Sequence, residues 1–306
     1  MAIDHAAAHM PKPDGRDLHL NEAELLLQNL DFSPADMKSA ILKFDDSTDF
    51  HFESPLPTPY AVNNIVHGRL YKCDDQWRQK PVILLLHGWN DALDHHFFFP
   101  RHARRLNELG LNAATLQLPW QFDRCPRELG AWGDFLCADV LRTVEATLQA
   151  MAEIQSFVNW VTEQGCPFVG LWGVSMGAWL AGLTICHDSR IGVAVLAVPI
   201  ARLDRLVEEV AFCETIRAAL QNRSVDLRRL NLVSNRPVIA RENILLVEAE
   251  HDLFVDKETV EDLWQAWDKP DIWRLRHGHI SFLAAPGLSK RVVRWIAARA
   301  NEHAAK

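Results

Sequence analysis

Residues 168–183 read FVGLWGVSMGAWLAGL, and a single serine, Ser175, stands there between Gly173 and Gly177. An apolar run of strand length precedes the serine, and an apolar run of helical length follows it. In a strand, tight turn and helix, the pattern Gly-x-Ser-x-Gly presents the serine hydroxyl at the edge of a sheet. Small residues also occur wherever a strand packs closely against a helix. A nucleophilic role therefore depends on partners elsewhere in the chain.

Short apolar runs alternate with amphipathic helical patterns along most of the sequence. Six runs have the length of buried strands, at 81–86, 111–118, 168–173, 191–198, 243–249 and 271–276. Helical patterns cover 98–109, 134–164, 176–187, 202–221, 257–268 and 288–303. This alternation predicts an α/β fold with a mostly parallel sheet and helices on both faces. Residues 62–73 are expected to add antiparallel strands at one edge.

Two segments lie outside this alternation. Residues 1–60 are predicted as an N-terminal helical extension, with helices over 21–30 and 33–44, before a main domain at 61–306. A small helical insertion is expected at about 201–240, because apolar residues from Leu203 to Leu220 repeat at helical spacing. This insertion fits a crossover helix covering the sheet as well as a lid over a pocket.

Composition excludes several classes of function. The 306 residues carry a net charge of −8, which gives no general attraction to nucleic acid. The six cysteines show no C-x-x-C pairing, which is typical of reduced thiols in a cytoplasmic protein, and the N-terminus has no secretory signal pattern. The longest apolar run, 191–200, is about half of what a bilayer crossing needs, so no integral membrane association is expected. A homo-oligomer is left open.

A serine nucleophile needs a base within hydrogen-bonding reach. The expected place is the loop after the last strand, where the sequence reads His277-Gly278-His279. We favour His279 over His277, because Gly278 lets the loop turn inward and His277 is closer to the end of the strand.

The imidazole in turn needs a carboxylate that fixes its tautomer. Four acids follow or end the penultimate predicted strand, namely Glu248, Glu250, Asp252 and Asp256. Glu248 is expected within the strand, Glu250 at its end, and Asp256 at the cap of the next helix. Asp252, at the start of the loop, is therefore the predicted acid.

A tetrahedral intermediate needs two backbone donors. One is predicted to be the N–H of Met176, directly after the nucleophile. The other is predicted to be the N–H of Trp89 in the segment His87-Gly88-Trp89, with Asn90 as the alternative. His87 itself is expected to brace this loop by hydrogen bonding.

Aromatic residues on the neighbouring loops suggest an apolar substrate pocket, for which Phe97, Phe98 and Trp120 are the candidates. The alternative is that these rings pack the loops onto the body. Arg124 and Arg127 fit either an acidic substrate group or ordinary surface charge. Asp94-His95-His96 is interpreted as a helix cap with packed or solvated histidines, and no metal site or cofactor is expected.

The motifs HGW, GVSMG, HD and GHIS occur in this order, and together they make residues 62–303 resemble the alpha/beta-hydrolase superfamily. The resemblance implies an eight-stranded sheet and a catalytic triad of Ser175, Asp252 and His279. Three local segments are also similar to the group called abhydrolase domain-containing protein eighteen: DHHFFFPR (94–101), GVSMGA (173–178) and GHISF (278–282).

These residues predict a serine hydrolase that acts on a small-molecule ester or other acyl substrate through an acyl-enzyme, with a carboxylesterase as the first choice. A peptidase, a thioesterase or an acyltransferase would use the same three side chains. A noncatalytic interaction protein with this fold is the alternative from another class.

Overall fold

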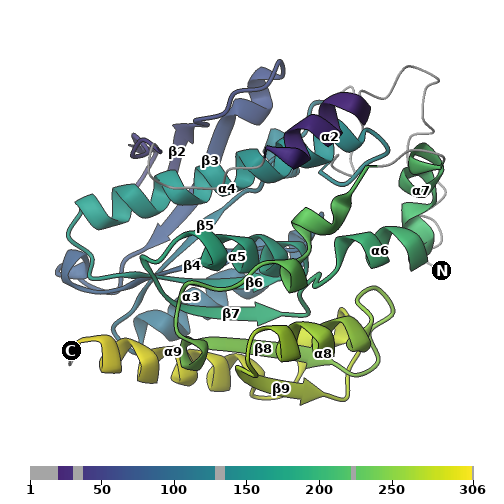
Figure 1. The fold of residues 1–306 in the computed structure, drawn as a ribbon. Helices are drawn as coiled ribbons and strands as arrows, with labels where there is room; N and C mark the ends of the chain where they lie inside the picture. The colour runs from purple at the N-terminus through teal and green to yellow at the C-terminus, as the bar shows by residue number, and fades with distance from the viewer. Residues whose placement is uncertain (1–19, 30–36, 128–134, 222–224, 305–306) are drawn as a thin grey trace.

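The structure is a computed structural model, and it describes residues 20–29, 37–127, 135–221 and 225–304. Within these residues a single sheet has the strand order β1-β2-β3-β5-β4-β6-β7-β8-β9, with helices packed around it (Figure 1). The strands are β1 (Lys43–Phe44), β2 (Asp49–Glu53), β3 (Ile65–Tyr71), β4 (Val82–Leu86), β5 (Asn112–Leu116), β6 (Val169–Val174), β7 (Ile191–Ala197), β8 (Ile244–Ala249) and β9 (Asp271–Leu275).

The register of the sheet brings six loops to one edge. Strands β5, β4, β6, β7, β8 and β9 run parallel, whereas β1, β2 and β3 pair antiparallel with their neighbours. Leu86 at the end of β4 is level with Leu116 of β5 and Gly173 of β6. The loops that follow these parallel strands therefore leave the sheet side by side, which is where ligands bind in sheets of this kind.

Both faces of the sheet are covered, and this explains the continuous apolar runs. All five residues of β4 are buried. Leu84 and Leu86 belong to one core, which they share with α4 and α5, while Ile83 and Leu85 belong to a second core, shared with α3 and α9. The helices are α2 (Leu20–Gln28), α3 (Phe99–Asn107), α4 (Val140–Glu163), α5 (Met176–His187), α6 (Leu203–Glu209), α7 (Glu214–Leu220), α8 (Lys257–Ala266) and α9 (Leu288–Ala304).

The main alternation predicted from the sequence is confirmed. The six apolar runs form β4 to β9, and residues 62–73 contribute the antiparallel β3. The helical patterns correspond to α3, α4, α5, α8 and α9. Asp139 caps α4 by accepting the backbone N–H of Arg142, and Asp256 caps α8 by accepting that of Glu258, as expected for Asp256.

The N-terminal segment differs from its prediction. Helix α2 (Leu20–Gln28) overlaps the first predicted helix over 21–30 and begins one residue earlier. The predicted helix over 33–44 is wrong for residues 37–44, and 33–36 lie outside the described residues. The backbone N–H of Ala40 donates to Ser156 of α4, and Lys43–Phe44 pairs with β2 instead. Strands β1 and β2 thus come from the segment assigned to a helical extension, and β1 is a ninth strand where eight were expected.

The insertion at 201–240 contains α6 and α7 rather than one continuous helix, because a short 3₁₀ turn, Ala211–Cys213, separates them. Most of its apolar positions are buried as the helical spacing predicted, with Leu203 and Leu206 as examples, whereas Val210 and Leu220 are partly buried. Farther along, the indole N–H of Trp179 in α5 donates to the backbone oxygen of Leu230. One part of the insertion therefore covers the body, while α6 borders the loop after β8, with which it lines a crevice.

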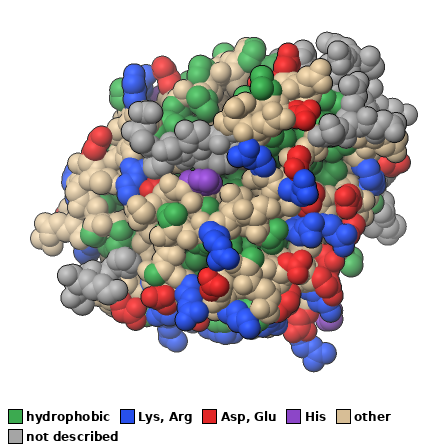
Figure 2. Space-filling view, in the orientation of Figure 1, with side chains coloured by type: hydrophobic (Ala, Val, Ile, Leu, Met, Phe, Trp, Pro, Cys, Tyr) green, Lys and Arg blue, Asp and Glu red, His purple; other side chains and the backbone are tan. Residues whose placement is uncertain are grey.

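The surface in the view of Figure 2 carries acidic and basic side chains interspersed, without a broad patch of one sign. Of the helices in the described ranges, none combines the length and the apolar character that a membrane span requires.

Candidate active site

Ser175 occupies a strained turn between β6 and α5. Its backbone has φ 53° and ψ −113°, a region that costs roughly 1–3 kcal/mol for a residue other than glycine. The turn is held on both sides, because the Ser175 N–H donates to the oxygen of Ala197 (2.8 Å) and its carbonyl accepts from Trp179 (2.9 Å). The serine is neither fully buried nor freely exposed.

The two flanking glycines are required by close backbone approach. A Cβ on Gly177 would overlap the backbone of Leu86 at the end of β4, and one on Gly173 would overlap the backbone of Gly177. Strand and helix therefore pack closely here, and this close packing presents Ser175 at the sheet edge.

The predicted base lies next to the serine, and the predicted acid lies next to the base. His279 Nε2 is 2.9 Å from Ser175 Oγ, and His279 Nδ1 is 2.7 Å from Asp252 Oδ2. The side chain of Asp252 is 2% exposed, and that of His279 is 15% exposed. This arrangement brings His279, rather than His277, to Ser175.

Two backbone donors orient the acid from its far side. Asp252 Oδ1 accepts the N–H groups of Phe254 (2.8 Å) and Val255 (2.9 Å). These bonds hold the carboxylate in place and leave Oδ2 for the imidazole. The ring of Phe254 packs against His279 with centroids 5.0 Å apart, a contact that sequence analysis did not single out.

The other acids have different surroundings. Glu248 lies in β8, where burial raises the pKa of its carboxyl, and it pairs with Arg274 at 3.6 Å. Asp256 caps α8. Asp252 is thus the acid placed against His279, as the position at the start of the loop predicted.

The segment His87-Gly88-Trp89 lies beside the serine at Gly88. A Cβ on Gly88 would lie 3.5 Å from that of Ser175. His87 is fully buried, and burial lowers the pKa of its imidazole to about 4, so the ring is neutral at physiological pH. Its Nε2 accepts the N–H of Leu118 at 3.1 Å, so Nδ1 carries the proton and donates to the carbonyl of Gly88 at 2.7 Å.

The hydrogen bond from His87 to the carbonyl of Gly88 holds the Gly88–Trp89 peptide, which carries the predicted oxyanion donor, the N–H of Trp89. The carbonyl of Gly88 and the N–H of Trp89 belong to one planar peptide and point in opposite directions. The ring of His87 therefore fixes the orientation of the Trp89 N–H. Met176, the other predicted donor, is the first residue of α5, where N–H groups have no acceptor within the helix.

Of the predicted pocket residues, Phe97 and Phe98 lie in a short π-helix, Asp94–Phe98, and Trp120 lies in the loop after β5. Phe97 is 48% exposed, and its ring lies under the guanidinium of Arg101. Phe98 is half-buried, and its ring packs edge-on against Phe97. Trp120 is buried against Tyr60, with centroids 5.1 Å apart. Contact of these rings with a substrate stays a prediction.

The structure also gives outcomes for the predictions on His95 and Arg124. His95 is buried and stacks on Phe122, with centroids 5.1 Å apart, which agrees with a packed histidine. Arg124 is fully buried, so neither the substrate contact nor the surface charge considered for it is right. Its guanidinium makes two hydrogen bonds to Glu153 of α4, at 2.6 and 2.7 Å, and ties the loop after β5 to that helix.

Comparison with known proteins supports the fold. No protein-family model matches the chain. The chain is 28% identical over 233 residues to protein Rv2627c of Mycobacterium tuberculosis, a match covering 73% of this chain but only 54% of that protein. The chain therefore spans about half the length of this relative.

Solved structures resemble the chain more completely. The acetyl xylan esterase from Paenibacillus sp. R4 has a TM-score of 0.60 and 15% identity, covering 97% of this chain and 99% of that chain. XC6422 from Xanthomonas campestris, described as an a/b serine hydrolase without lid, has a TM-score of 0.53 and 15% identity, covering 83% and 97%. The protein has the alpha/beta-hydrolase fold.

Proposed function

We propose that this protein is a serine hydrolase that cleaves carboxylic esters through an acyl-enzyme. The observation that carries the proposal is the continuous hydrogen-bonded path from Ser175 Oγ to His279 Nε2 (2.9 Å) and from His279 Nδ1 to Asp252 Oδ2 (2.7 Å). A nucleophile, a base and a group that orients the base are the three parts that acyl transfer by serine requires.

In the first half of the proposed reaction, Ser175 Oγ bonds to the ester carbonyl carbon as His279 Nε2 takes the hydroxyl proton. The N–H groups of Met176 and Trp89 stabilise the negative oxygen of the tetrahedral intermediate. The bond to the leaving alcohol then breaks, and His279 gives its proton to that oxygen. Asp252 stabilises the imidazolium in between.

In the second half, His279 takes a proton from water, whose oxygen attacks the acyl-enzyme. The intermediate collapses, the bond between the acyl carbon and Ser175 Oγ breaks, and the serine recovers its proton from His279. The carboxylic acid is released, and no other reactant is consumed.

Esters are the first choice of substrate because structural neighbours of the chain include an acetyl xylan esterase. Thioesters, peptides and transfer to an acceptor other than water would use the same side chains. The local resemblance to the abhydrolase domain-containing protein eighteen group, and the expected cytoplasmic location, stay predictions.

The function is tested by measuring turnover of p-nitrophenyl esters from acetate to laurate, beside matched thioester and peptide substrates. We expect ester turnover by the wild-type protein and a loss of about 10⁶-fold in kcat for Ser175→Ala. Turnover of thioesters or peptides alone would assign the site to one of those classes. Ester turnover that survives Ser175→Ala would overturn the proposal.

A further inference from the structure

Gln121 is a buried residue that the proposed reaction does not use. It lies in the loop after β5 and is 0% exposed. Its Oε1 accepts the backbone N–H of Asn90, in the loop after β4, at 2.6 Å. Because that N–H can only donate, the carbonyl end of the amide must face it. The other end, Nε2, is buried with no hydrogen-bond partner in the described parts of the chain.

The backbone around this contact is strained. Trp120 and Phe122, on either side of Gln121, have φ values of 61° and 50°, and Asn90 has φ 49°. Bulky residues rarely adopt this region, and the cost persists only where the surroundings enforce it. Here the N–H of Trp120 donates to the side chain of Asn63 at 2.8 Å. The strained loop thus holds the Gln121 side chain against the neighbouring loop.

The contact lies directly beside the proposed oxyanion donor. Asn90 follows Trp89, so Gln121 holds the peptide after Trp89, while the ring of His87 holds the peptide before it. Together the two bonds fix both sides of the residue whose N–H would face the developing oxyanion. Donors stabilise a transition state best when they are already oriented and need no reorganisation.

We propose that Gln121 is a positioning residue of the oxyanion hole: its side-chain carbonyl fixes the loop that presents the Trp89 N–H to the substrate. This proposal rests on the proposed serine hydrolase function. Gln121 acts through the Asn90 N–H, so its effect falls on the transition state rather than on binding of the substrate in its ground state.

The test compares Gln121→Met, which removes the acceptor at similar size, with Gln121→Glu, which keeps an acceptor oxygen. Because Nε2 donates to no partner in the described structure, the Glu variant loses no observed bond. Gln117→Met is the matched control: Gln117 is also buried and also follows β5, but its amide donates to Asp123, away from the loop after β4.

The measurements are kcat and KM for the best p-nitrophenyl ester, and Ki for a trifluoromethyl ketone, whose adduct with serine carries an oxyanion. For Gln121→Met we expect kcat to fall by about 10- to 100-fold with KM little changed, and Ki to rise in parallel. Gln121→Glu should recover most of the lost kcat, and Gln117→Met should resemble the wild type. A loss of stability alone would not raise Ki and lower kcat together at constant KM.

Hydrogen–deuterium exchange of the segment containing Asn90 supplies a readout that does not depend on turnover. Exchange there should be faster in Gln121→Met than in Gln117→Met. If Gln121→Met does not fold, Gln121→Asn, whose shorter side chain withdraws the acceptor, takes its place with the same expectation.

The positioning role would be overturned if the Gln121 and Gln117 variants had equal exchange rates, equal kcat and equal Ki. In that case, turnover by the wild-type protein would still support the hydrolase function. A wild-type protein without turnover would instead remove the hydrolase function and this role with it.

Discussion

At the scale of single residues, the candidate site is a series of hydrogen bonds from Asp252 through His279 to Ser175. The groups that hold Asp252 determine which atom donates and which accepts in each of these bonds. The N–H groups of Phe254 and Val255 occupy one oxygen of Asp252, and His279 Nδ1 lies against the other oxygen. A proton on Nδ1 leaves Nε2 as the acceptor that faces Ser175 Oγ. The tautomer that acyl transfer needs thus follows from where the acid is anchored.

Replacing Asp252 by Asn should exchange the donor and acceptor roles of the two nitrogens of His279. The amide oxygen would stay on the two backbone N–H groups, and the NH₂ group would face His279 Nδ1, which would then have to accept. The proton would move to Nε2, which could no longer accept from the serine. We expect kcat to fall by about 10⁴-fold in a protein that remains folded, measured by ester turnover and circular dichroism.

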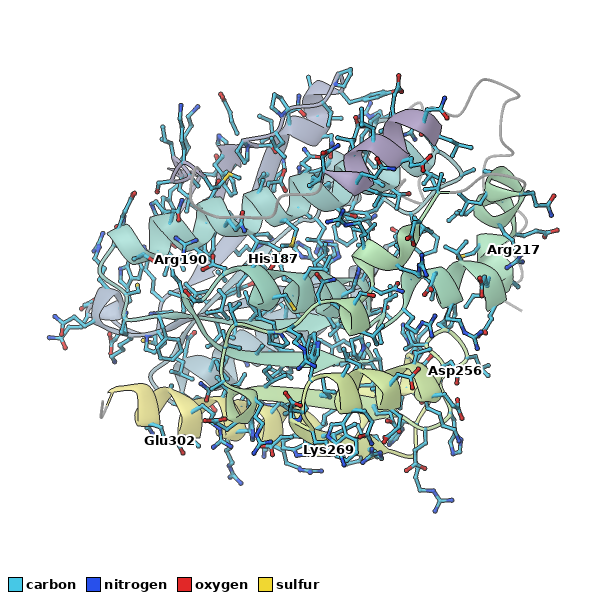
Figure 3. The ribbon with its side chains drawn as sticks, in the orientation of Figure 1. His187, Arg190, Arg217, Asp256, Lys269 and Glu302 are labelled. Atoms are coloured by element: carbon cyan, nitrogen blue, oxygen red, sulfur yellow. The ribbon has the colours of Figure 1, made fainter. Side chains whose placement is uncertain are left out.

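Asp256→Asn is the matched control for this prediction. Asp256 lies near the start of α8 (Figure 3), where it caps the helix, and Asn serves as a cap about as well as Asp does. The kcat of Asp256→Asn should stay close to the wild-type value. Equal losses in the two variants would mean that any change in this loop disturbs the site, and an undiminished rate in Asp252→Asn would exclude Asp252 as the acid.

The sequence allowed the three main residues of the site to be predicted, because each stands at a fixed place relative to a strand end. The contacts of Gln121 and Arg124 could not be predicted. Their partners, Asn90 and Glu153, lie about thirty residues away, and the loop between β5 and α4 has no periodicity that would show which side chains turn inward.

At the scale of elements, the site depends on how closely α5 approaches β4 and β6. Gly177 on α5 lies against the backbone of Leu86, whereas Gly182 on the same helix lies against the side chain of Leu232. Backbone cannot move aside without separating helix and sheet, but a leucine side chain can adopt another rotamer. The structure therefore requires glycine at position 177 but can accommodate a methyl group at position 182.

We predict that Gly177→Ala destabilises the protein by at least about 3 kcal/mol and removes ester turnover, because the added methyl group overlaps β4. Gly182→Ala should change the free energy of unfolding by only about 1 kcal/mol, since the helical propensity gained by alanine offsets the shift of Leu232. Urea denaturation and kcat measure both. Similar behaviour of the two variants would contradict the close approach at Gly177.

Elements were predicted well where periodicity and burial agree, as in β4 to β9. The prediction over 33–44 was wrong because tertiary contacts outweighed local preference. Ile41, on the apolar face of the predicted helix, is 80% exposed, and the backbone nearby pairs with β2 and α4. The alternating pattern DFHFE over 49–53 was the available signal for β2, whose Phe50 and Phe52 are each 1% exposed.

At the scale of the whole molecule, buried histidines connect stability to pH. Burial lowers the pKa of His87 to about 4, of His95 to about 2 and of His102 to about 3, from an ordinary value of 6.5. Between pH 6.5 and these values the unfolded chain binds protons that the folded protein does not. The free energy of unfolding must therefore decrease as the pH falls through this window.

We expect each of these imidazoles to remove about 2 kcal/mol of stability between pH 6.5 and about pH 5, less an offset from Glu248, whose raised pKa acts in the opposite direction. Urea denaturation at pH 7.5, 6.5 and 5.0 measures the change. His102→Phe, which can keep the stack on Trp172, should make the dependence shallower. Stability that stays constant over this range would contradict the burial of neutral histidines.

The most direct test of the proposed nucleophile is labelling with a fluorophosphonate, followed by mass spectrometry of the modified peptide. The reagent forms a bond to an activated serine oxygen and needs no knowledge of the natural substrate. We predict one adduct on Ser175 in the wild-type protein and no adduct in Ser175→Ala. A wild-type protein that is not labelled, or one labelled at another residue, would contradict the assignment of Ser175 as the nucleophile.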